Sequence, residues 1–129
     1  MTDIVELTIP VTADLVVLAR LTAATVASRA DFDIEEIEDL RLAVDELCIS
    51  MIQGIEEGRL GLQFSRDEDE IKVSCRYLGK LRPVPDPSER PLDGLSGRIL
   101  DALVDEHGES MEDGERRAWL LKRRARQSG

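Results

Sequence analysis

The sequence is poor in the side chains on which most metal and nucleophile sites depend. Its 129 residues include one histidine and two cysteines, Cys48 and Cys75, far apart in the chain. This spacing excludes a zinc site with paired ligands and a disulfide framework. A nucleophilic triad would have to use His107, which stands beside Gly108 without a nucleophile motif. We therefore interpret His107 as a solvated turn residue and both cysteines as small buried residues.

Aromatic residues and positive charge are also scarce. Aromatic side chains make up 3% of the chain, so the core has to be built from aliphatic residues, and stacking on nucleic-acid bases is not expected. Asp and Glu outnumber Lys and Arg by 27 to 17, giving a net charge of −10. This charge repels phosphate backbones and favours a basic protein partner. We expect no nucleic-acid partner.

Targeting and membrane signals are missing as well. The segment Met1–Glu6 has no basic stretch ahead of an apolar one, and no apolar run approaches the ~20 residues that span a bilayer. We therefore expect a cytoplasmic protein without a membrane partner. The length suits one domain, residues 1–129.

Hydropathy alternates with a period of two in several segments, which is typical of half-buried strands. Residues 5–9 form one such segment, and residues 60–64 and 71–77 form two more, joined by an acidic turn as in a hairpin. A last strand is expected over residues 117–124 and a further one around 109–112.

Three helices are expected between these strands. The first, residues 15–26 after a Thr12 cap, is apolar on nearly every face and therefore needs cover on two sides, by the sheet and by a partner or second subunit. The second starts at the cap Asp33 and ends near Gly58, with an apolar stripe of Ile37, Leu40, Val44, Leu47, Met51 and Ile55. The third follows residues 94–97.

The segment of residues 79–93 holds four of the five prolines and is expected to be a long, lid-type loop. The fold class that follows from this order of elements is α+β. We expect a two-layer sandwich, with a mostly antiparallel sheet of four or five strands and three helices on one face.

Opposite the apolar stripe, the second helix carries a polar line of Glu46, Ser50 and Gln53, with Leu42 and Ile49 beside it. A polar line framed by aliphatic residues suggests the wall of a pocket.

The segment Asp39–Ser50, which reads Asp-Leu-Arg-Leu-Ala-Val-Asp-Glu-Leu-Cys-Ile-Ser, resembles the nucleotide-site helix of the bacterial anti-sigma-factor serine kinases. These kinases belong to the GHKL, or Bergerat-fold, ATPases. The order of elements agrees through Gly94-Leu95-Ser96-Gly97 and the helix after it, so the resemblance covers nearly the whole chain. It implies a homodimer that holds a sigma factor until a STAS-class anti-anti-sigma protein competes for it. Many relatives phosphorylate that competitor on serine with ATP and magnesium.

The resemblance assigns roles to two residues of the second helix. Glu46 falls where the family has a glutamate that acts as general base, a role that needs a carboxylate within reach of the attacking hydroxyl. Ser50 falls where the family has an asparagine that binds magnesium, and a serine hydroxyl is a weaker ligand for a hard cation.

Two further motifs complete the implied nucleotide site. Tyr77-Leu78-Gly79 stands at the family's Asp-x-Gly, so that Tyr77 places a ring where adenine would lie and removes the carboxylate that reads it. Gly94-Leu95-Ser96-Gly97 resembles a Gly-Leu-Gly-Leu phosphate cradle. Gly94, Leu95 and Gly97 remain as candidate phosphate contacts.

Two functions of different kinds follow from this pattern. The favoured one is a degenerate anti-sigma factor that works by binding, without effective ATP hydrolysis or kinase activity and with neither ATP nor magnesium as a required cofactor. The alternative is an active ATP- and magnesium-dependent serine kinase, and a third option is a scaffold kept for dimerisation.

Simpler interpretations stand beside these roles. Glu46 is then an exposed helical glutamate, and the glycines only start a helix. The acidic cluster of Glu35, Glu36, Glu38 and Asp39 is a favourable helix N-terminus or a docking surface for basic sigma-factor helices. The basic segment 115–129, with six basic residues and one acidic, is a solvated strand end.

Overall fold

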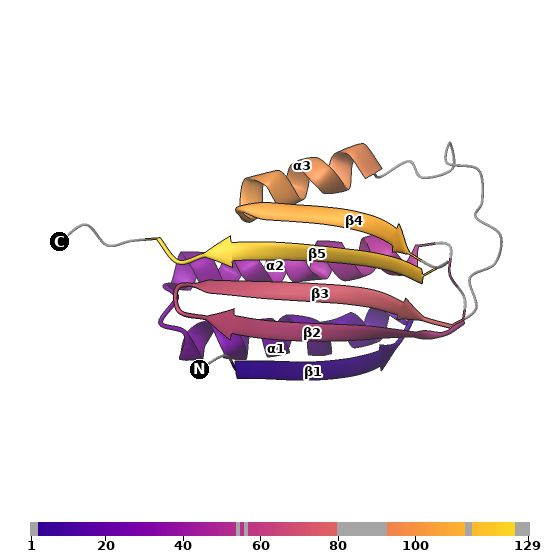
Figure 1. Cartoon of the computed structure of the whole chain (residues 1–129), viewed down its shortest axis with the longest axis horizontal. Coiled ribbons are helices and arrows are strands. Elements are labelled where there is room, and N and C mark those ends of the chain that lie inside the picture. Colours follow the sequence, from indigo (N-terminus) through magenta and orange to yellow (C-terminus); the bar gives the residue numbers. More distant parts are fainter. Residues whose placement is uncertain (1–2, 54, 56, 80–92, 113–114, 126–129) are drawn as a thin grey trace.

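The computed structural model describes residues 3–53, 55, 57–79, 93–112 and 115–125. Three helices, α1 (Val16–Arg29), α2 (Ile34–Ile52) and α3 (Asp93–Leu103), lie on one face of one sheet, and a short 3-10 turn, η1 (Ala13–Leu15), precedes α1 (Figure 1). The strands of the sheet are β1 (Asp3–Pro10), β2 (Arg59–Asp67), β3 (Glu70–Leu78), β4 (Glu106–Glu112) and β5 (Glu115–Arg123).

The five strands are ordered β1-β2-β3-β5-β4, and every neighbouring pair is antiparallel. The predicted α+β sandwich is confirmed. The loop predicted over residues 79–93 lies, apart from its two end residues, outside the described residues. In the part of the chain that is described, no helix is both long and apolar enough to cross a bilayer.

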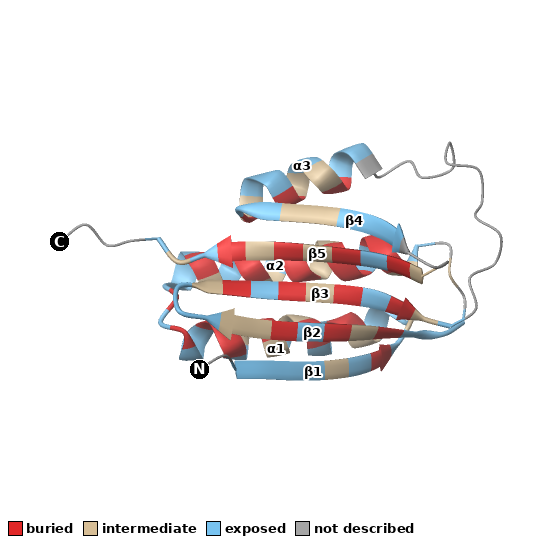
Figure 2. Cartoon of the chain, in the orientation of Figure 1, coloured by how far each residue is buried: buried red, intermediate tan, exposed pale blue. Residues whose placement is uncertain are grey.

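Alternation of buried and exposed residues along the strands separates the two faces of the sheet (Figure 2). On β3, for example, Ile71, Val73, Cys75 and Tyr77 are buried, whereas the residues between them are half-buried or exposed. The buried set faces the helices, because successive side chains of a strand point to opposite sides. None of the three described helices lies on the opposite face, which we call the open face (Figure 1).

Helix α2 is the central helix of this layer and contacts α1, α3, β3 and β5. Its start is set by a capping box, in which the Asp33 carboxylate accepts from the Glu36 backbone N–H and the Glu36 carboxylate accepts from the Asp33 N–H. Most of the predicted apolar stripe is fully buried, and only Ile37 and Ile55 are half-buried. The helix ends at Ile52 instead of near Gly58, so Ile55 lies beyond it.

Helix α1 packs through small residues and leaves larger ones outside. Ala19, Ala23 and Ala27, four positions apart, are completely buried and allow α1 to lie close against α2. Leu18 and Leu21 are exposed on the other side. The prediction of a Thr12 side-chain cap was wrong. The Thr12 side chain makes no capping hydrogen bond, because a 3-10 turn precedes α1.

Other local predictions need correction near the C-terminus. His107 is not in a turn but lies half-buried in β4, with Nε2 2.6 Å from Asp101 Oδ1. The glycine-containing segment 94–97 forms the second to fifth residues of α3 and does not precede it. The basic segment is largely strand β5, where Lys122 is buried and donates to the Leu103 carbonyl oxygen at 2.7 Å.

We expect Asp33→Ala to lower the free energy of unfolding by about 1 kcal/mol, because the mutation removes one half of the capping box. Urea unfolding followed by circular dichroism measures this loss. Glu35→Ala is the matched control, since Glu35 lies in the same first turn but outside the box, and it should cost only a few tenths of a kcal/mol. Equal losses in the two variants would contradict the assignment of the cap.

Candidate functional site

The central contact of the site joins α2 to α3. Ser96, only 6% exposed at the start of α3, donates its hydroxyl to Oε1 of Glu46 on α2 at 2.6 Å, across 50 positions of sequence. A hydrogen bond from a neutral hydroxyl to a carboxylate is among the stronger kinds in proteins. One oxygen of Glu46 therefore already has a serine hydroxyl as its partner.

Ser50 lies one turn further along α2 and is buried. Its hydroxyl donates to the carbonyl oxygen of Leu47 at 2.9 Å, so its proton is used within the helix. No group of three or more His, Cys, Asp or Glu side chains suited to a metal ion occurs within the described ranges. The donor set around Ser50 is thus poor for magnesium, which prefers carboxylates and retained waters. Gln53, the last residue of the predicted polar line, is exposed.

The first turn of α3 supplies the remaining polar groups of the site. A Cβ placed at Gly94 or Gly97 would meet nothing within 4 Å, and Leu95 is exposed. Backbone N–H groups in the first turn of a helix have no partner within the helix. These amides are the groups through which this turn could contact an anion.

Tyr77 lies where β3 ends, close to the segment that follows α2. Its ring is buried, and its hydroxyl donates to the carbonyl oxygen of Glu57. The ring also fills the space beside two glycines, because a Cβ at Gly58 would lie 2.6 Å from Tyr77 Cε2 and one at Gly79 would lie 2.7 Å from its hydroxyl. Gly58 has a φ of 124°, which favours glycine. The Tyr77 side chain is therefore fixed by its hydrogen bond to Glu57 and by its close packing against Gly58 and Gly79.

The structure brings Glu46 together with the glycine-containing turn, while Tyr77 and Gly79 belong to the end of β3. Sequence reasoning included Ser96 only as a member of the cradle-like segment and missed its bond to Glu46. A signal was present, because Ser96 stands where the Gly-Leu-Gly-Leu pattern has its second glycine. The contact itself depends on how α3 packs on α2.

The acidic cluster at the start of α2 has structural partners. Besides its role in the capping box, Glu36 accepts from the backbone N–H of Ala125 at 2.6 Å. Glu38 pairs with Arg41 at 2.7 Å, and Asp39 lies 3.7 Å from Lys122. Three of the four acidic residues thus stabilise the fold.

The two cysteines are buried where α2 packs on β3. A hydrogen bond with the Cys75 thiol and burial together raise the pKa of Cys48 well above its usual value. A thiol with a raised pKa forms little thiolate and reacts slowly. This agrees with the interpretation of both cysteines as small buried residues.

The fold and the site define a two-layer α+β domain in which a helical carboxylate faces the glycine-containing first turn of another helix. No protein-family model matches the chain. The serine-protein kinase RsbW of Bacillus subtilis (strain 168) is 35% identical over 121 residues, which cover 81% of this chain and 76% of that protein. The chain therefore belongs to the family of the RsbW serine-protein kinases.

Two further relatives carry the same name. RsbW of Bacillus cereus (strain AH187) is 29% identical over 127 residues, covering 83% of this chain and 79% of that protein. RsbW of Bacillus pumilus (strain SAFR-032) is 36% identical over 77 residues, covering 55% of this chain and 48% of that protein.

We expect Ser96→Ala to lower the free energy of unfolding by roughly 1.5–3 kcal/mol, since a charged, partly buried acceptor loses its donor. Urea unfolding of Ser96→Ala, Glu46→Ala and the double variant gives the coupling energy between the two side chains. Ser110→Ala, at an exposed serine of β4, is the matched control and should be nearly neutral. Strictly additive losses at positions 46 and 96 would contradict a direct interaction.

Proposed function

We propose that this chain is a GHKL-type anti-sigma factor that holds an RNA polymerase sigma factor by binding, without effective ATP hydrolysis or kinase activity. A STAS-domain anti-anti-sigma protein would release the sigma factor by competing for the same chain. Membership of the RsbW family supports the regulatory role. The hydrogen bond between Ser96 and Glu46 is the observation that supports a binding role over catalysis.

A general base needs a carboxylate oxygen within reach of the hydroxyl that attacks. At Glu46, one oxygen already accepts the hydroxyl of Ser96. A phosphate cradle also needs close approach of the backbone, which glycine permits and a buried serine side chain opposes. Ser96 therefore acts against catalysis in two ways, by engaging the base and by filling the cradle.

The other two departures from the family pattern act on ATP itself. The Ser50 hydroxyl is bonded to its own helix, and Tyr77 supplies a held ring where a carboxylate would read adenine. Leaving one buried polar group unmatched costs about 1–3 kcal/mol, which lowers affinity by roughly 5- to 150-fold. Losses at adenine and at magnesium together move a micromolar affinity to millimolar or weaker.

The active kinase remains the second candidate function, and two observations favour it. The relatives with high coverage are named serine-protein kinases, and Glu46 stands at the position of the general base in the resemblance. In this alternative, ATP binding would have to displace the Ser96 hydroxyl from Glu46.

A docking surface for the sigma factor is available on α2. Ile34, Leu42 and Ile49 are exposed and form one stripe along the helix, with Glu38 and Asp45 between them. These two carboxylates also pair with Arg41 at 2.7 Å and with Arg20 at 3.7 Å. A surface that alternates aliphatic and acidic side chains suits a basic amphipathic helix. We place the contact on this stripe and not on the acidic cluster as a whole, because the stripe combines exposed aliphatic side chains with its carboxylates.

The proposed protein is a homodimer, and the exposed side of α1 is its interface. Val17, Leu18 and Leu21 are exposed there, and the neighbouring Thr22 and Thr25 hydroxyls donate to helix carbonyls, which leaves their methyl groups for contact. A small monomer that leaves such a surface in water would expose an unusually apolar patch.

We expect Leu21→Glu to convert the dimer into a monomer, because a buried unpaired carboxylate at an apolar interface is strongly unfavourable. Sedimentation equilibrium measures the change in mass. Met111→Glu is the matched control. Met111 is 47% exposed, close to the 52% of Leu21, and it lies on the edge strand β4, away from α1. A wild-type chain that sediments as a 14.4 kDa monomer at high concentration would remove the dimer from the proposal.

For the purified protein, we expect tight binding of a sigma factor and at most millimolar affinity for magnesium-ATP. Capture from the native host followed by mass spectrometry identifies the sigma factor, and titration calorimetry measures both affinities. Phosphotransfer to the STAS protein captured in the same way is measured in parallel.

The outcome of this experiment separates the two candidate functions. Micromolar binding of magnesium-ATP, together with serine phosphorylation that Glu46→Ala abolishes, would establish the kinase and overturn our proposal. Ser96→Ala provides a further control. It frees Glu46 without adding a catalytic group, so a large gain in phosphotransfer would show that Ser96 alone restrains the enzyme.

A further inference from the structure

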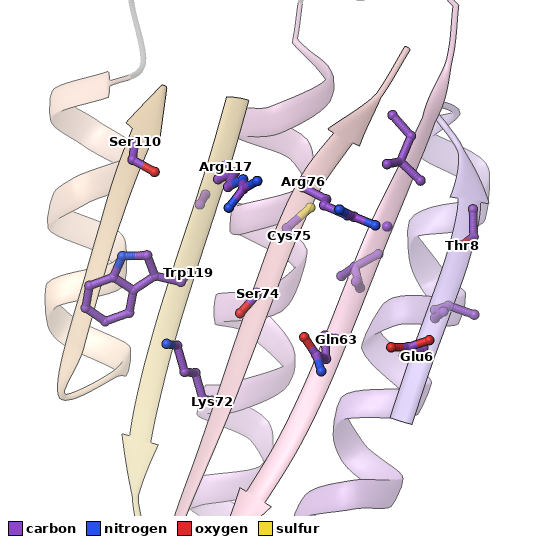
Figure 3. Close-up of a pocket in the computed structure, with 15 residues that line it drawn as sticks. Glu6, Thr8, Gln63, Lys72, Ser74, Cys75, Arg76, Ser110, Arg117 and Trp119 are labelled. Atoms are coloured by element: carbon purple, nitrogen blue, oxygen red, sulfur yellow. The ribbon is translucent and has the colours of Figure 1, made fainter. Parts of the chain in front are cut away.

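The open face of the sheet, turned away from the helices and from Glu46, carries a shallow hollow of about 510 Å³. All five strands contribute to its lining (Figure 3). Polar side chains predominate, among them Gln63 and Ser74, and Trp119 is the one aromatic residue that lines it. This surface takes no part in the site described above.

Two glycines shape the hollow. Gly108 on β4 pairs with Trp119 on β5, and a Cβ at Gly108 would lie 2.8 Å from the indole Nε1, so the ring occupies the space above β4. Gly61 on β2 pairs with Thr8 on β1 and with Arg76 on β3, and a Cβ there would lie 3.1 Å from Leu78 Cδ1 and 3.6 Å from Arg76 Nε, so these two side chains occupy the space above this glycine. Side chains at either position would fill part of the hollow.

Positive charge is concentrated in the lining of this hollow, while Glu70, Glu106 and Glu115 lie elsewhere on the same face and pair with its arginines. The lining includes Lys72, Arg76 and Arg117 but only one carboxylate, that of Glu6, whereas the whole chain has a net charge of −10. The Lys72 ammonium lies 5.6 Å from the centroid of the Trp119 ring, within the range of a cation–π interaction. Cations and an aromatic ring thus stand side by side.

A carboxylate of the chain itself shows what this surface accepts. Arg76 and Arg117 stand opposite each other on β3 and β5, and Glu115 is the first residue of β5. Its oxygens are 2.7 Å from Nη2 of Arg117 and 3.8 Å from Nη1 of Arg76. The hydrogen bond from Arg117 lowers the pKa of Glu115, which keeps this carboxylate ionised.

We propose that the open face binds an acidic segment of a protein partner, with Trp119 as the apolar anchor and Lys72, Arg76 and Arg117 receiving its carboxylates. Charge complementarity decides the occupant. A short acidic segment brings its few charges within a Debye length of these cations, about 8–10 Å. A nucleic acid extends its phosphates past the face and meets the net negative charge of the rest of the chain.

The proposal is independent of nucleotide binding and of sigma-factor capture, because it uses none of the residues assigned to either. The binding of an acidic segment can therefore fail while the proposed anti-sigma function holds, and the reverse is also true. The open face also lies on the side of the sheet opposite to the helices, so an acidic segment could occupy it while a second partner contacts α2 (Figure 1).

The test uses the full chain and a short fluorescein-labelled peptide of Glu, Leu and Ser. Fluorescence anisotropy measures binding, and Trp119, the only tryptophan, reports occupancy through its own emission. We expect Arg76→Glu to weaken binding about tenfold, because a charge pair becomes a repulsion. Lys72→Glu should act similarly, and added salt should weaken binding of the wild-type chain. Circular dichroism verifies that the variants are folded.

Arg98→Glu is the matched control, because it changes the net charge equally at an exposed position of α3. The proposal predicts no effect of Arg98→Glu and no binding of the same peptide with Lys in place of Glu. Equal loss in Arg76→Glu and Arg98→Glu, or no binding to the wild-type chain, would overturn it. Two other outcomes would also overturn the proposal. One is that Arg76→Glu alters binding of a single-stranded oligonucleotide and not of the peptide, and the other is that it alters the sedimentation of the chain alone.

Discussion

The burial of the apolar side of α2 is the interaction on which the rest of the structure depends. Leu40, Val44, Leu47 and Met51 are fully buried, and each contributes about 1.5–3 kcal/mol relative to an exposed side chain. The same helix contacts α1, α3 and two strands of the sheet. Because Glu46 lies on this helix, the core fixes where its carboxylate can be.

Regular elements whose signal lies within a few residues were predictable. The stripe of α2 and the alternation of the β2–β3 hairpin depend on local periodicity, and both were recognised. Strand β4 has much weaker alternation and owes its extent to pairing with β5, so only its end was expected. His107 belongs to the same strand. Its half-buried position and its Asp101 partner depend on how α3 packs beside β4.

The candidate site shows the same division. Glu46, Ser50 and the cradle-like segment could be located from their types and order, because a resemblance is read along the chain. The hydrogen bond from Ser96 to Glu46 could not, since it joins two helices that are 50 positions apart. Nor could the open face, where the register of β3 with β5 places Arg76 opposite Arg117. Tertiary pairing created both features.

The two faces of β3 can change independently of each other. Residues that alternate along the strand point to opposite sides, so Cys75 and Tyr77 face the helices while Ser74 and Arg76 face the open side. A substitution on one face changes the other only through the backbone. A shift of register by one residue, in contrast, would exchange the two sets and bury Arg76 in place of Tyr77. Substitution at Tyr77 is therefore compatible with an unchanged open face, whereas any change in strand pairing is not.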